Sequence, residues 1–132
     1  MRTVKPDSHR GPVPESALLV DAAARARGRV AMLNASRPGG LDGWTISVAQ
    51  WEVMRAHILD TIDALAGDDG SVPLQAVVAA ARERLGSHEA FPTGNVTNYC
   101  RFVKVDLEAR CEVERLAGSS PQRIRRFMPD AG

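Results

Sequence analysis

The sequence predicts a small α+β domain in which a core of three helices lies between two β-hairpins, with one further helix at the N-terminal side. Two observations predict it: apolar residues recur at helical spacing in three consecutive segments, and β-prone segments separated by turn residues flank them on both sides. A chain of 132 residues has room for one such domain with one hydrophobic core. We therefore divide the chain into a disordered arm (1–13), an N-terminal helix (14–28), the main domain (29–127) and a tail (128–132).

The N-terminal region combines a polar arm with a helix. Proline, glycine and charged residues dominate the arm, which predicts disorder. Pro14 suits the first turn of a helix, and the alanine-rich run that continues to Arg27 favours one. Gly28 then provides the expected end of this helix.

The first hairpin is predicted from two β-prone segments, 29–34 and 44–46. Between them, residues 37–43 contain one proline and three glycines, a composition typical of a turn. The three elements together predict a β-hairpin with a long loop.

The first core helix is the clearest in the sequence. Ser47 and Gln50 have the spacing of a capping box, in which each side chain binds a backbone N–H at the start of the helix. One apolar stripe follows at intervals of three and four residues: Trp51, Met54, Ile58, Ile62 and Leu65.

Two further core helices follow. Ser71-Val72-Pro73 is expected to open the second, with Ser71 as its N-cap, and Gly86 to close it. The third is expected from about Asn95 to Arg110, with an inward face of Val96, Cys100, Val103 and Leu107.

The C-terminal end predicts a second hairpin, with strands at 112–116 and 122–127 around a glycine- and proline-containing turn. Three helices followed by such a hairpin are the outline of a winged helix-turn-helix. We therefore predict a winged helix-like fold with a three-helix core, an N-terminal hairpin, a C-terminal hairpin as the wing, and an extra N-terminal helix.

Several segments resemble a small bacterial family of uncharacterised proteins, a domain of unknown function with a winged helix-turn-helix-like fold. The resemblance rests on Leu33-Asn34 with Pro38-Gly39, on Phe91-Pro92 with Gly94, and on 103–110 with 118–126. The resemblance covers about residues 29–127. It implies the fold, and the family has no assigned activity. Cys111 departs from the winged-helix pattern, which usually has glycine after the third helix. Either the helix ends differently here, or Cys111 accepts a positive φ at a cost of about 1 kcal/mol.

One functional hypothesis is binding of double-stranded DNA, since winged helices place the third helix in the major groove and the wing against the backbone. Residues at the start and on one side of the third helix, together with wing arginines, are the candidate contacts: Thr93, Asn95, Thr97, Asn98, Arg101, Lys104, Arg123 and Arg125.

The alternative is a winged helix that serves protein interaction or homodimerisation. Phe102, Val105 and Ala109 form a second apolar stripe on the third helix, which indicates burial on two sides, and Phe102 and Val105 are the candidate interface. The stripe could meet the N-terminal helix or a second subunit. Glu108 continues the polar stripe and would repel phosphate, and wing glutamates could neutralise the wing arginines.

Composition and motifs exclude several other classes. The formal net charge is +1, no apolar run reaches the roughly 18 residues of a membrane helix, and two cysteines indicate a reducing cytoplasm. No catalytic or metal-binding motif occurs, so we expect no enzyme, no cofactor and no metal site. His57 is expected on a helix surface, Cys100 in the core, and Cys111 at a more exposed position.

Overall fold

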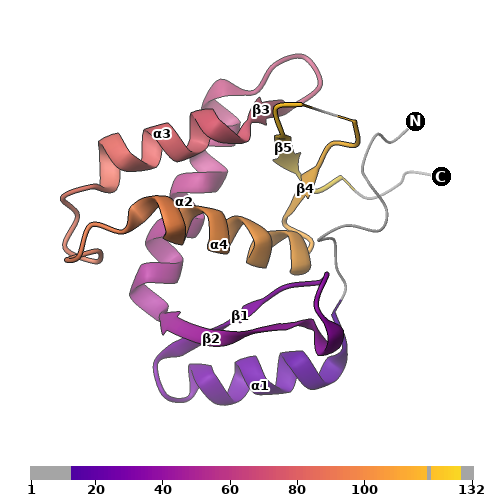
Figure 1. Ribbon diagram of the computed structural model, residues 1–132, viewed down its shortest axis with the longest axis vertical. Coiled ribbons are helices and arrows are strands. Elements are labelled where there is room, and N and C mark those ends of the chain that lie inside the picture. The colour runs from indigo at the N-terminus through magenta and orange to yellow at the C-terminus, as the bar shows by residue number, and fades with distance from the viewer. Residues whose placement is uncertain (1–12, 119, 129–132) are drawn as a thin grey trace.

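The computed structural model describes residues 13–118 and 120–128, which form an α+β domain with four α-helices and two small antiparallel sheets (Figure 1). The elements are α1 (Glu15–Arg25), β1 (Arg29–Leu33), a 3-10 turn (Pro38–Gly40), β2 (Leu41–Ser47), α2 (Val48–Leu65), β3 (Ser71–Pro73), α3 (Leu74–Leu85), α4 (Val96–Ala109), β4 (Val113–Arg115) and β5 (Arg123–Arg126). The predicted arm and tail lie, apart from Val13 and Met128, outside the described residues. None of the helices in the described part is long and apolar enough to cross a membrane.

Helix α4 lies at the centre of the domain. Figure 1 shows α3 on one side of it and the β1–β2 hairpin on the other, with α2 crossing behind α4 and α1 covering the far side of the hairpin. The main core joins the inward residues of α2, α3 and α4 to both sheets. A smaller cluster of Ala17, Leu33 and Ala109 connects α1, β1 and the C-terminal end of α4.

The first hairpin forms as predicted, although β2 begins at Leu41, earlier than expected. Val30 pairs with Ile46, and the register shifts between Ala31 and Leu33. Gly40 has a φ of 78°, and a Cβ at this position would lie 2.8 Å from the Cβ of Val13. Only glycine therefore fits where the turn meets the start of the described chain.

The capping box at the start of α2 is confirmed. The Gln50 backbone N–H donates to Oγ of Ser47 at 3.0 Å, and the Ser47 N–H donates to the Gln50 side chain at 3.2 Å. The predicted N-cap role of Ser71 is wrong, because Ser71 begins strand β3 and α3 begins only at Leu74.

The second sheet has three strands in the order β3-β5-β4, where the sequence predicted a two-stranded hairpin. Val72 pairs with Ile124 across β3 and β5, and Arg115 pairs with Ile124 across β4 and β5. Pro73 is tolerated because β3 lies at the edge of the sheet.

Helix α4 ends in a Schellman motif. The Cys111 N–H donates to the Glu108 carbonyl at 3.2 Å, and the Glu112 N–H donates to the Leu107 carbonyl at 3.0 Å. Cys111 has a φ of 61° and is the one described residue other than glycine with a positive φ. Of the two alternatives for this position, the structure therefore shows the second: the helix ends as expected, and Cys111 adopts the left-handed backbone conformation.

Candidate functional site

The C-terminal half of α4 carries a buried carboxylate that holds three parts of the domain together. Asp106 is fully buried and accepts hydrogen bonds from Leu33 N at 2.9 Å, Trp51 Nε1 at 2.8 Å and Arg110 Nε at 2.8 Å. Burial raises the pKa of Asp106, against the lowering effect of Arg110. Since every interaction is internal, this carboxylate positions elements and does not face a ligand.

Arg110 extends this network to α1. Its guanidinium donates to Asp21 at 3.0 Å and to the Ala31 carbonyl at 3.1 Å. Asp21 also accepts from the Ala31 N–H at 2.9 Å. Burial by itself would raise the pKa of Asp21, but the hydrogen bond and charge of Arg110, together with the hydrogen bonds from Ala31 and Arg25, outweigh burial and the pKa is lowered.

Lys104 does not lie on the exposed side of α4, contrary to the sequence expectation. Its Nζ lies 2.7 Å from Glu108 Oε1 and 2.8 Å from Gln122 Oε1, and its side chain is 5% exposed. The expectation that Glu108 continues an outer polar stripe is also wrong, because Glu108 is buried against Lys104. The C-terminal hairpin and the core cover this part of the helix, so the ammonium group serves as an internal partner.

The arginines of the C-terminal hairpin are engaged within the domain as well. Arg125 donates to Glu114 at 2.9 Å, as the self-neutralising alternative for the hairpin anticipated, but the pair is buried and not on the solvated face that this alternative expected. Arg123 donates to Oγ of Ser71 at 2.8 Å. These two candidate contacts therefore connect strands of the sheet.

The remaining candidates stay at the surface, around the N-terminal end of α4. Thr93, Asn95, Asn98 and Arg101 are exposed, and Thr97 is half-buried. The structure thus separates the predicted set into a surface group of five, of which four are exposed and Thr97 is half-buried, and an internal group of three, namely Lys104, Arg123 and Arg125.

A small cavity opens beside this exposed group, between β2 and α4. We refer to it as the aromatic pocket; its volume is about 140 Å³ and it is lined by Trp44, Asn95, Asn98, Tyr99 and Phe102. The rings of Trp44 and Phe102 meet edge to face, with centroids 4.9 Å apart. Phe102 remains 40% exposed.

The polar members of the aromatic pocket are fixed by local hydrogen bonds. Asn98 Nδ2 donates to Asn95 Oδ1 at 3.0 Å, which ties the two carboxamides together across one helical turn. The Tyr99 ring stacks at a tilt on Phe91, 5.0 Å between centroids, and its hydroxyl receives a hydrogen bond from Gln50. The pocket is therefore preformed by residues of β2, α2 and α4.

The second apolar stripe of α4 is covered mainly by the chain itself. Ala109 packs against Ala17 and Leu33, as the alternative of contact with the N-terminal helix anticipated, and Val105 is half-buried. Of the two candidate interface residues, Phe102 is the more exposed.

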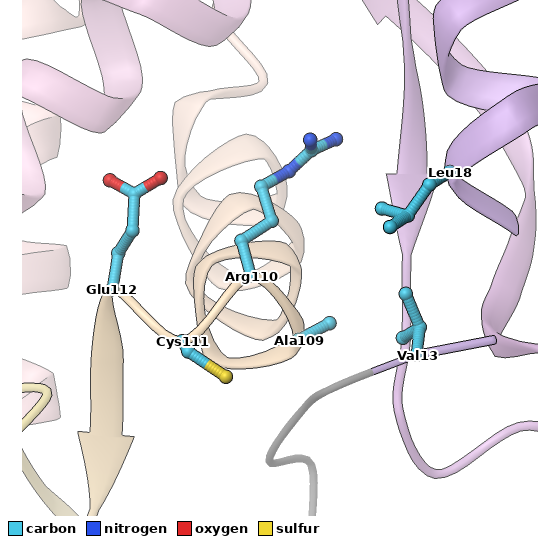
Figure 2. Close-up of a pocket in the computed structure, with 6 residues that line it drawn as sticks. All are labelled: Val13, Leu18, Ala109, Arg110, Cys111 and Glu112. Atoms are coloured by element: carbon cyan, nitrogen blue, oxygen red, sulfur yellow. The ribbon is translucent and has the colours of Figure 1, made fainter. Parts of the chain in front are cut away.

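A larger cavity, about 330 Å³, opens at the C-terminal end of α4 (Figure 2). Arg110 and Glu112 line it, but Arg110 binds Asp21 and Glu112 pairs with Arg55 at 2.6 Å. Figure 2 shows Leu18 and Val13 on one wall and the end of α4 opposite. Both charged side chains among the described residues that line this cavity are therefore engaged within the domain.

The surface of α1 adds exposed apolar side chains on the hairpin side of the domain. Leu19 is 64% exposed and Val20 is 47% exposed. Val20 and Trp44 line one hollow of about 190 Å³, so Trp44 borders both this hollow and the aromatic pocket.

His57 is buried and not on the helix surface, contrary to expectation. Its Nε2 lies 3.1 Å from the Val77 carbonyl, and its Nδ1 is buried without a hydrogen-bond partner. Burial lowers its pKa. The described residues contain no cluster of three or more metal-ligating side chains.

Sequence reasoning found Asn95, Asn98 and Phe102 but assigned them to two different hypotheses. It did not find that Trp44 and Tyr99 join them in one pocket. The available signal was Trp44, which directly follows the turn residues 37–43 and begins a β-prone segment. Its contact with Phe102 of α4 is made only in the tertiary fold, so the sequence alone does not show it.

Comparison with known proteins gives one match. Residues 29–124 match the model of a family described as a family of unknown function, DUF6958. No curated protein and no solved structure matched the chain.

Proposed function

The chain belongs to this family of unknown function, and we propose that it is a protein-interaction module on a winged helix-like scaffold, whose aromatic pocket receives a side chain of a partner protein. The function we propose is binding without catalysis. The observation that carries it is the preformed cavity between Trp44 and Phe102.

The winged-helix assignment is supported by element order. Helices α2, α3 and α4 alternate with strands as α2-β3-α3-α4-β4-β5, and the strands pair in the order β3-β5-β4. In DNA-binding proteins with helix-turn-helix architecture, the second helix of the motif enters the major groove. Because the same scaffold hosts other functions, the choice between DNA binding and protein binding has to be argued from the residues of the site.

The charges of the site favour a protein partner over DNA. Binding of duplex DNA draws on several cations that neutralise phosphates. Of the four predicted cationic contacts, Lys104, Arg123 and Arg125 have partners inside the domain. The fourth, Arg101, is exposed and forms no hydrogen bond or ion pair with the residues that the structure describes.

The composition of the pocket fits protein recognition. Aromatic residues and arginine are enriched in protein interfaces, and anchors that fill a small preformed pocket contribute much of the binding energy. The aromatic pocket combines three aromatic side chains with two carboxamides that can bind a peptide group.

Selection from a random library of 12-residue peptides displayed on phage tests this proposal. Peptides selected on the full chain should lose affinity at least tenfold when Phe102→Ala is introduced. Leu65→Ala is the matched control, since Leu65 is an exposed apolar residue 57% accessible on α2. Circular dichroism and urea unfolding verify that both variants fold. Failure to select any peptide that depends on Phe102 would overturn the proposal.

Binding of double-stranded DNA is the second candidate. It is favoured by the exposed polar residues at the N-terminal end of α4, which are Thr93, Asn95, Asn98 and Arg101. Fluorescence anisotropy with mixed-sequence duplex DNA at about 50 and 200 mM salt tests it. Salt-sensitive binding that Arg101→Ala weakens would establish this function in place of the first.

A further inference from the structure

Helix α1 packs on the domain with one side and leaves its other side uncovered. Its buried residues are Ala17, Asp21 and Ala24, and this side contacts β1 and the end of α4. The opposite side consists of four exposed residues at helical spacing, the last of them the C-cap: Leu19, Ala22, Ala23 and Ala26. We refer to these four residues as the outer face of α1. Figure 1 shows α1 as the outermost element on this side of the domain, with no other labelled element beyond it.

The outer face is apolar and its flanks are apolar too. Leu19 is the most exposed large apolar side chain among the described residues. Leu18 and Val20 flank it, and about half of each remains exposed. Asp21 is the only charged residue between positions 15 and 25, and it is buried. A contiguous exposed apolar surface of this kind typically marks an interaction site.

Opposite charges lie at the two ends of the outer face. Glu15 lies in the first turn of α1, and Arg27 follows directly after Ala26. Neither forms an ion pair with any residue that the structure describes. Arg27 donates a hydrogen bond to the Ala23 carbonyl, one turn before it, at 3.3 Å. Both charges are therefore available to a partner that docks on the outer face.

The outer face is complementary to itself when its direction is reversed. In an antiparallel pair of α1 helices, Leu19 of each copy packs among the small alanines of the other, and Glu15 of each copy lies towards Arg27 of the other. Such self-complementarity is what a two-fold contact between identical chains requires. A parallel pair would instead bring equal charges together, which is unfavourable. We infer that the outer face binds the same face of a second copy of the chain, with the two α1 helices antiparallel.

This contact goes beyond the proposed function and is compatible with it. None of the outer-face residues lines the aromatic pocket, so each copy keeps its pocket for a partner protein. One short helix per copy buries less surface than the roughly 1,200–2,000 Å² of stable complexes, so the dimer should dissociate at low micromolar concentration. A membrane surface fits the face less well. A helix that lies on a membrane exposes a basic side to the headgroups, whereas the opposite side of α1 is packed on β1.

Sedimentation equilibrium of the full chain tests the inference. The unmodified chain should show a concentration-dependent dimer between about 5 and 500 µM. Leu19→Glu should associate at least tenfold more weakly, because a dimer would bury two carboxylates between apolar helices. Leu65→Glu is the matched control, since Leu65 is an exposed leucine at the end of α2, and it should associate as the unmodified chain does. Circular dichroism verifies that both variants fold.

Charge reversal tests the antiparallel orientation. At low salt, Arg27→Glu and Glu15→Arg should each weaken association about threefold or more, because each change places equal charges together at both ends of the contact. The double variant Glu15→Arg/Arg27→Glu restores opposite charges and should regain the affinity of the unmodified chain. A structural role of either residue within its own helix would not give this recovery.

The outcomes separate this inference from the proposed function. A chain that stays monomeric at about 500 µM would overturn the inference, as would a dimer that Leu19→Glu leaves intact and Phe102→Ala dissolves. Sensitivity to Leu19→Glu without any response to the charge variants would overturn the antiparallel arrangement. Selection of Phe102-dependent peptides is measured separately, so its success or failure does not depend on the state of association.

Discussion

Nζ of Lys104 lies 2.7 Å from Oε1 of Glu108, one turn further along α4, and both side chains are almost completely buried. Gln122 on the C-terminal hairpin accepts a second hydrogen bond from the same ammonium at 2.8 Å. This pair therefore links the central helix to the hairpin. Because the pair is buried, removal of one partner should destabilise the folded protein by leaving the other charge without a counter-charge.

We expect Lys104→Met to lower the free energy of unfolding by about 3–5 kcal/mol, because it leaves the Glu108 carboxylate buried without a partner. The double variant Lys104→Met/Glu108→Leu should be much closer to the unmodified protein, since no charge remains buried. Urea unfolding followed by circular dichroism measures both. Equal losses for the single and double variants would show that the carboxylate finds another partner.

Cys111→Gly should stabilise the protein by up to about 1 kcal/mol, because glycine adopts the positive φ of this position without a steric penalty. Cys111→Ala is the matched control: it removes the sulfur but keeps the Cβ, so it should not give the gain. A loss of stability with glycine would mean that the Cys111 side chain contributes more by packing than its backbone costs.

The two cysteines should differ sharply in reactivity. Cys100 is fully buried, and burial raises the pKa of its thiol to about 12, so little thiolate forms near neutral pH. Cys111 is partly exposed. Titration of the folded protein with a chromogenic disulfide reagent should therefore label one thiol quickly, and Cys111→Ser should abolish that phase. Rapid labelling that persists in this variant would place Cys100 within reach of solvent.

Stability should fall as the pH drops below about 6.5. Burial lowers the pKa of His57 in the folded protein, so between the folded value and the ordinary histidine value of 6.5 the unfolded chain takes up a proton that the folded chain does not. The loss between pH 7.5 and 5.5 should be up to about 1 kcal/mol from this group. Nε2 is satisfied by Val77, and Nδ1 has no acceptor for an added proton.

His57→Gln isolates this contribution, since glutamine can still donate to the Val77 carbonyl but does not titrate. Urea unfolding at the two pH values should show a smaller pH dependence for the variant than for the unmodified protein. The same slope in both would assign the acid sensitivity to other groups.

Local sequence signals predicted the helices well, since the relevant interactions lie within a few residues. The Ser47–Gln50 capping box and the apolar stripe of α2 are of this kind. Strand β3 was missed because it has three residues, one of them proline, and exists only through pairing with β5, where Val72 meets Ile124. Nothing near β3 in the sequence reports that pairing.

The candidate site was predicted in part for the same reason. Helical periodicity correctly placed Arg101 at the surface, but it also placed Lys104 there. A helical wheel cannot show which outward positions a distant segment will cover. Gln122 and Trp44, which complete the surroundings of Lys104 and Phe102, come from the two hairpins at opposite ends of the chain.

The segment that defines the family begins at residue 29, after α1. Yet Asp21 of α1 binds both Arg110 and the Ala31 N–H, and Ala17 closes the apolar contact of Leu33 with Ala109. A shortened chain that starts at residue 29 would expose the surfaces of Leu33 and Ala109 that α1 covers. It would also leave the Arg110 guanidinium with one carboxylate fewer. The packed unit therefore extends beyond the segment that matches the family, because α1 supplies both a carboxylate and an apolar contact to it.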